Sequence, residues 1–176
     1  MLLMDCHHND PQAPELLNGM MKMLLPPEIE RAVFLCVGSD RHILDCLGPL
    51  TGSLLQEAIP ALAVYGTLDK PLHAGNLMSE LGAINQQHPE SIHFAVDASA
   101  GAPSELGALR LRDEPLMPGK ALLKRLPPLG HYSLTGVLSL KGRGRFKDPQ
   151  VSSLNPVYQM ARLIAQAVQS YYLADY

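Results

Sequence analysis

The 176-residue sequence has few cysteines and no long apolar run, and both features narrow the kind of protein it encodes. The number of cysteines is odd, and no two of them form a Cys-x-x-Cys pair; they are Cys6, Cys36 and Cys46. This disfavours a disulfide framework or a zinc knuckle. No apolar run reaches the roughly 20 residues of a membrane-spanning helix, and the N-terminus lacks the pattern of a signal peptide. We therefore expect a cytoplasmic protein with no membrane partner.

The sequence also lacks an excess of basic residues. Its 14 Lys and Arg residues against 17 Asp and Glu residues give a formal net charge of −3. This balance provides no general attraction for nucleic acid. The phosphate-binding patterns GxxxxGK[ST] and GxGxxG are absent as well, so we expect neither a nucleic acid nor a nucleotide as the partner.

What is present is the composition of a globular protein, with 47% hydrophobic residues arranged in runs between Gly and Pro. The length suits one domain rather than two. Residues 1–30 carry four prolines around one short helical pattern, and we interpret them as an N-terminal extension. Residues 31–176 are then expected to form a single α/β domain.

The first half of that domain alternates strand and helix patterns. Residues 32–38 are a continuous apolar run that ends in glycine, as in a parallel strand buried on both faces. A helical pattern follows in 48–59, a strand in 61–66, a helix in 76–87 and a strand in 91–99. This order predicts right-handed crossovers and a doubly wound, mostly parallel sheet.

The second half has a different pattern. Residues 106–119, 121–130 and 132–142 resemble shorter strands joined by turns, with one of them as an antiparallel edge. Residues 155–172 have apolar side chains at helical spacing and predict an amphipathic helix that packs on the sheet.

Two aspartates follow strands of the predicted sheet. Asp45 lies in the loop after the first parallel strand and Asp97 ends the third. If these strands are neighbours, as in a flavodoxin-like order, both carboxylates face one cleft outside the strand ends. They could then share a proton as an acid and base pair, or hold a metal ion together with a histidine. A purely structural alternative is that they cap the following helix and turn.

Histidines are the next candidates for such a site. His73 and His131 lie in predicted loops that we expect over the strand ends, where either could act as a ligand or a base. His93 alternates with apolar residues inside a strand, so we expect it to pack in the core. His42 is placed near the tip of its loop.

Five sequence blocks carry a resemblance to a known family. They are residues 33–52 (VFLCVGSDRHILDCLGPLTG), 65–77 (YGTLDKPLHAGNL), 94–101 (FAVDASAG), 115–130 (PLMPGKALLKRLPPLG) and 133–140 (SLTGVLSL). In this order and spacing they resemble the YyaC-type spore protease family, which is similar to the spore germination protease and to hydrogenase maturation proteases. The resemblance implies a three-layer α/β/α domain with a mostly parallel sheet, of the phosphorylase/hydrolase-like kind.

The resemblance also implies a peptidase site. Asp45, three residues before Gly48, corresponds to the loop carboxylate of the maturation proteases, and Asp97 corresponds to the aspartate that ends a later strand. These two are the implied catalytic pair. If a divalent metal such as Zn or Ni takes part, its implied ligands are Asp45, Asp97 and His131, with His73 as the second choice.

The function implied is that of a sporulation-associated endopeptidase, a hydrolase of peptides or small proteins in the cytoplasm of the forespore or spore. The alternative is a non-catalytic relative that keeps the scaffold to bind a peptide or a partner protein. The sequence leaves open whether the chain forms a homo-oligomer.

Overall fold

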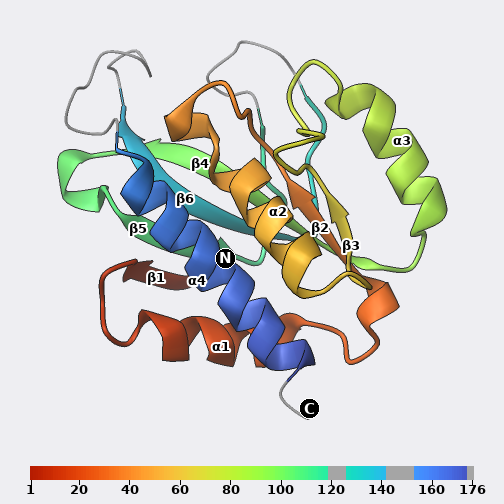
Figure 1. Ribbon diagram of the computed structural model, residues 1–176, viewed down its shortest axis with the longest axis horizontal. Coiled ribbons are helices and arrows are strands. Elements are labelled where there is room, and N and C mark those ends of the chain that lie inside the picture. Colours follow the sequence, from red (N-terminus) through yellow and green to blue (C-terminus); the bar gives the residue numbers. More distant parts are fainter. Residues whose placement is uncertain (119–125, 142–152, 174–176) are drawn as a thin grey trace.

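A computed structural model of the chain describes residues 1–118, 126–141 and 153–173. Its centre is a six-stranded sheet with the order β1-β5-β6-β4-β2-β3 (Figure 1). The strands are β1 (Leu2–His7), β2 (Ala32–Cys36), β3 (Ala63–Tyr65), β4 (Ile92–Gly101), β5 (Ala108–Arg112) and β6 (Tyr132–Leu140).

The sheet is mixed, with a parallel part that carries the candidate site. Strands β3, β2, β4 and β6 are parallel to one another, whereas β5 runs antiparallel to both β6 and β1. Strand β2 lies between β3 and β4, which confirms the expected order in which the first and third parallel strands are neighbours. The direction of winding reverses at β2, where open α/β sheets place their ligands.

Helices cover both faces of this sheet, as predicted. They are α1 (Ala13–Leu24), α2 (Leu47–Ala58), α3 (Leu77–Gln87) and α4 (Leu154–Tyr172). Helices α1, α2 and α4 lie together on one face, and α3 lies beside β3 (Figure 1). Side chains of α3 pack against the opposite face of β2, so the fold has three layers.

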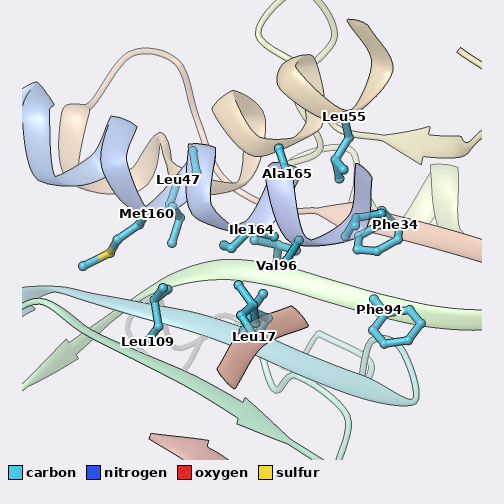
Figure 2. Close-up of a cluster of buried hydrophobic side chains, with 14 of the residues drawn as sticks. Leu17, Phe34, Leu47, Leu55, Phe94, Val96, Leu109, Met160, Ile164 and Ala165 are labelled. Carbon is cyan, nitrogen blue, oxygen red and sulfur yellow. The ribbon is translucent and has the colours of Figure 1, made fainter. Parts of the chain in front are cut away.

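Strand β2 is buried on both faces because its residues alternate between two hydrophobic clusters. Phe34 and Cys36 belong to the larger cluster, beneath α1, α2 and α4. Figure 2 shows Phe34 in this cluster with side chains of the helices and of the neighbouring strands. Val33 and Leu35 belong to the smaller cluster, with Leu77 and Ile84 of α3. The continuous apolar run in the sequence reflects this double burial.

The segment 1–30, which we expected to be an extension, contributes β1 and α1 to the same sheet and core. Strand β1 pairs with β5, and α1 packs against β1 and α4. Met4 and Cys6 are buried, whereas Asp5 and His7 are exposed. This alternation has the period of a half-buried strand.

The second half of the chain also differs from the expectation in part. The segment 106–119 holds β5, which is antiparallel but lies between β1 and β6 and is not the expected edge strand. Strand β6 is nine residues long and also lies inside the sheet. Of the strand expected in 121–130, residues 121–125 lie outside the described residues, and Leu129 makes an isolated bridge to Leu116. In the part of the chain that the structure describes, no helix combines the length and apolar character needed to cross a bilayer.

An ion-pair network joins β1 to the rest of the sheet. Arg110 on β5 donates from Nε to Asp5 at 3.0 Å and from Nη2 to Glu105 at 2.7 Å. The backbone N–H of Ala102 and the Arg110 guanidinium together hold the pKa of Glu105 below its usual value. The ionised Glu105 therefore stabilises the folded state at any pH above the ordinary pKa of a glutamate. This stabilisation is lost as the pH falls from that value through the lowered pKa of the folded state.

We predict that Arg110→Met loosens β1. The substitution keeps an apolar stem of similar length but removes both ion pairs, and such partly exposed pairs contribute little each, so amides of β1 should exchange roughly two- to fivefold faster. Hydrogen exchange read by mass spectrometry measures this, with Arg162→Met on the exposed side of α4 as the control. Unchanged exchange in residues 2–7 would show that the network does not hold β1.

Candidate active site

The loop after β2 is fixed to the sheet by backbone hydrogen bonds. The Val37 N–H donates to the Val96 carbonyl at 2.7 Å, and the Gly38 N–H donates to the Leu72 carbonyl at 2.9 Å. The next N–H, that of Ser39, donates to the carbonyl of Asp45 at 2.9 Å. The loop therefore closes on itself directly above the end of β2, with Asp45 at its base.

Asp45 is the last residue of a short 3₁₀ helix, η2 (Ile43–Asp45), which leads through Cys46 into α2. The position of α2 depends on Gly48, because a Cβ there would overlap the carbonyl oxygen of Val37. Gly38 has a φ of 148°, and a Cβ on it would overlap the carbonyl oxygen of Asp45. These two glycines let the first turn of α2 and the Asp45 backbone lie against the end of β2.

Asp97 reaches the same edge from β4, but it does not end that strand as expected, because β4 continues beside β6 to Gly101. Cys36, the last residue of β2, pairs with Val96, so Asp97 lies one residue beyond the end of β2. On its other side Asp97 pairs with Thr135 of β6, and its Oδ1 accepts the N–H of Ala98 at 2.7 Å. Helix η2 packs against β4. The structure thus places the short helix that carries Asp45 beside the strand that carries Asp97.

This edge suits negative charge and acid–base chemistry. Helix α2 begins two residues after Asp45, so Asp45 precedes its first turn, and the positive end of the helix dipole faces this edge. Asp45 and Asp97 are both partly exposed, which leaves them accessible to water and to a substrate.

The structure does not bring His131 to this edge. The Nδ1 atom of His131 accepts the N–H of His93 at 2.9 Å, near the beginning of β4. His131 precedes β6 by one residue and lies four residues before Thr135, the partner of Asp97. At about 3.3 Å per residue these positions are roughly 13 Å apart along the strand. His93 itself is buried, in agreement with the core position expected for it.

His73 lies closer to the site, in the segment after β3. Its neighbour Leu72 makes a parallel bridge with Val37 at the end of β2. The Nδ1 atom of His73 accepts the N–H of Gly75 at 3.0 Å. A neutral imidazole in this arrangement carries its proton on Nε2, which leaves no lone pair there for a metal.

The side chains that the structure describes at this edge do not supply the three ligands that a divalent metal ion needs. His131 lies at the other end of the strands, and His73 uses its lone pair within its own turn. In residues 1–118, 126–141 and 153–173, no three His, Cys, Asp or Glu side chains are grouped as a metal site requires. The described donor set therefore does not fit a Zn or Ni centre.

Thiol chemistry is also disfavoured at this site. Cys46, between η2 and α2, is buried, and this burial, together with Asp40 and Asp45, raises the pKa of its thiol. Burial likewise raises the pKa of Cys36, and burial with Asp10 and Asp5 raises that of Cys6. All three thiols remain protonated at neutral pH, whereas a nucleophilic cysteine needs a lowered pKa.

Two features of the site were missed or ranked low from the sequence. The close approach at Gly48 requires glycine, and the pattern Gly48-Pro49 just after an acidic loop was a signal for it. His42, which we placed near the tip of the loop, directly precedes η2, and its carbonyl accepts the N–H of Asp45 at 2.9 Å.

The family model described as "protein of unknown function (DUF1256)" matches residues 5–167. The chain belongs to this family. The match begins within β1, and so it includes most of the segment 1–30.

Two known proteins extend this result. The chain is 35% identical over 137 residues to the "uncharacterized protein YyaC" of Bacillus subtilis, covering 77% of this chain and 67% of that protein. In three dimensions it is similar to the crystal structure of the [NiFe] hydrogenase maturation protease HycI from Thermococcus kodakarensis. The TM-score is 0.55 at 19% identity, covering 85% of this DUF1256 chain and 98% of HycI. The expected α/β fold of the maturation protease kind is thereby confirmed.

Proposed function

We propose that this chain is a peptidase in which Asp45 and Asp97 share one proton and act as a general acid and base. The observation that carries the proposal is the pairing of β2 with β4, which places η2 and Asp97 at one edge of the sheet. The fold similarity to a maturation protease supports a peptide or a small protein as the substrate. Fold similarity alone does not assign a reaction, so the proposal depends on the two carboxylates.

Hydrolysis by this pair requires one carboxyl group to be ionised and the other to be protonated. The ionised group removes a proton from a water molecule, which then attacks the peptide carbonyl. The protonated group donates its proton to the carbonyl oxygen as the tetrahedral intermediate forms. As the intermediate breaks down, the proton taken from water passes to the leaving nitrogen, and the other carboxyl takes a proton back from a hydroxyl of the intermediate, so that the amine is released and the pair again holds one proton. Two like charges at short range disfavour double ionisation, and this keeps one proton on the pair.

We further propose that the enzyme acts during sporulation or germination, in the cytoplasm of the forespore or spore. The support is the resemblance of the five sequence blocks to spore proteases and the relative in Bacillus subtilis. Small acid-soluble spore proteins are therefore the first substrates to test. Purified protein should cleave them into fragments that mass spectrometry can assign to a defined bond.

The shared proton predicts how the rate responds to pH and to chelators. Below the optimum both carboxyls are protonated and above it both are ionised, so kcat/KM should fall on both sides of an acidic to mildly acidic maximum. Addition of EDTA should leave the rate unchanged, because the described residues form no metal centre.

The control is a zinc peptidase assayed with the same substrate and chelator, which should lose its activity. Loss of cleavage by this chain in EDTA, followed by recovery on adding zinc or nickel, would replace the proton-sharing pair by a metal mechanism.

A further inference from the structure

A pocket of about 320 Å³ is lined by residues of β3, of the following segment and of α3. Figure 1 shows β3 and α3 on the same side of the sheet. Apolar atoms in its lining come from Val64 of β3, Leu72 of the following segment and Ile84 of α3. Charged side chains come from Asp69, Lys70 and Glu80. The pocket therefore combines an apolar surface with charged groups.

Strand β3 offers a free edge at this pocket. Among the described residues β3 pairs with β2 alone, and it is the last strand on its side of the sheet. Its residues Ala63, Val64 and Tyr65 are all partly exposed. The outer N–H and carbonyl groups of an edge strand can bind an extended peptide as an additional strand.

The wall of the pocket is held in place before any ligand arrives. The Leu68 N–H donates to the Ser53 hydroxyl of α2 at 2.9 Å, and the Thr67 N–H donates to the Lys70 carbonyl at 3.1 Å. The Asn76 side-chain amide donates to the Pro71 carbonyl at 3.0 Å. A wall that is already ordered lowers the entropic cost of binding a flexible peptide.

The same wall leads to the two aspartates. Leu72, which lines the pocket, makes a parallel bridge with Val37 and accepts the N–H of Gly38. Gly66, which also lines the pocket, lies so close to Cys36 that a Cβ would overlap its carbonyl oxygen. Both contacts are with the end of β2, from which the Asp45 loop departs. A peptide along β3 would therefore run toward the proposed catalytic edge.

The charges of the pocket indicate which side chain it accepts. Asp69, Lys70 and Glu80 form no ion pair with any residue that the structure describes. Two carboxylates against one ammonium group leave the pocket with a net negative charge. A lysine or arginine side chain can lay its methylene stem on the apolar atoms and place its cationic end at the carboxylates.

We propose that the peptide substrate adds to the free edge of β3 and places a lysine or arginine side chain in this pocket. The inference rests on the proposed peptidase function, because it names the surface on which that substrate docks. It is tested separately from hydrolysis by measuring binding to Asp97→Asn protein, which keeps the pocket but lacks one of the two proposed catalytic carboxyls.

The probes are fluorescein-labelled hexapeptide libraries with lysine, alanine or glutamate fixed at each position, and fluorescence anisotropy measures binding. We expect the lysine libraries to bind at least tenfold more tightly than the glutamate libraries at one position. Glu80→Lys should remove this preference, whereas Glu15→Lys, the same charge change on α1 at the other end of the sheet, should keep it. N-methylation of alternate peptide amides should weaken binding, because strand addition uses every second N–H.

The possible outcomes separate the two proposals. If lysine-selective binding is removed by Glu80→Lys but the wild-type protein cleaves no peptide, the docking surface is supported and the peptidase function is overturned. The docking surface is overturned if the wild-type protein cleaves peptides but binding shows no lysine preference, and if the Glu80→Lys and Glu15→Lys proteins bind equally. That result leaves the peptidase function standing. Binding that no N-methyl group affects would overturn strand addition along β3.

Discussion

Asp97→Asn is expected to lower the rate of peptide hydrolysis by roughly a hundred- to ten-thousand-fold, the range that a positioned general acid or base contributes. The substitution should leave the fold intact. The Oδ1 atom of Asp97 accepts the N–H of Ala98 at 2.7 Å, and the amide oxygen of asparagine can accept the same bond. Asparagine cannot take up or release the proton, so the expected loss is chemical. Initial rates of cleavage measure it, with thermal melting as the test of folding.

Two further variants of the Asp45 loop control this experiment. Asp45→Asn should reduce the rate as strongly, because it removes the other member of the pair. Asp40 lies in the same loop but is exposed and outside η2. Asp40→Asn should therefore leave the rate almost unchanged. Equal cleavage by wild-type and Asp97→Asn protein would remove Asp97 from the chemistry. Peptide binding without any cleavage would favour the alternative of a non-catalytic binding protein.

The parallel half of the sheet was predictable because burial on two faces leaves a simple signal. Strand β2 appears in the sequence as a continuous apolar run and β4 as a largely apolar one, and the helix patterns between them require right-handed crossovers. Once β2 and β4 are neighbours, strand direction places Asp97 and the start of the Asp45 loop at one edge, and the return of Asp45 to that edge depends on Gly38 and Gly48. This is why two residues far apart in the sequence could be assigned to one edge before the structure was known.

The position of His131 shows where sequence reasoning stopped. Its place depends on where β6 begins and on which way β6 runs. A strand was expected from residue 132, but its direction was not available from the sequence. Because β6 is parallel to β4, the residue before its first position lies at the amino end of the sheet. If the strand at 132–140 had been known to run parallel to β4, His131 would have been placed away from the aspartates.

Strand β1 was missed for a different reason. Its alternation of buried and exposed residues is only six residues long, and Asp5 and His7 make it resemble a polar tail. An edge strand gains its stability from pairing with β5 and from Arg110, which are distant in sequence. Contacts of this kind leave no local pattern that a single sequence displays.

Gly48→Ala is expected to disrupt the junction between β2 and α2, and with it the base of the Asp45 loop. The new Cβ would overlap the carbonyl oxygen, the carbonyl carbon and the nitrogen of Val37. These are backbone atoms inside the sheet, so no side-chain rotation can relieve the overlap, and α2 must move away from β2. We expect the free energy of unfolding to fall by about 3 kcal/mol, the upper end of the typical cost of overpacking, because backbone must absorb the overlap.

Urea denaturation measures this loss, and Gly82→Ala is its matched control. Gly82 lies on the exposed side of α3, and a Cβ there meets no atom within 4 Å. Alanine should therefore stabilise α3 by about 0.5 to 1 kcal/mol, the ordinary gain for glycine replaced inside a helix. The two substitutions add the same methyl group with opposite expected signs. If Gly48→Ala were as stable as wild type, α2 would not lie against β2 as described, and the placement of Asp45 beside Asp97 would lose its support.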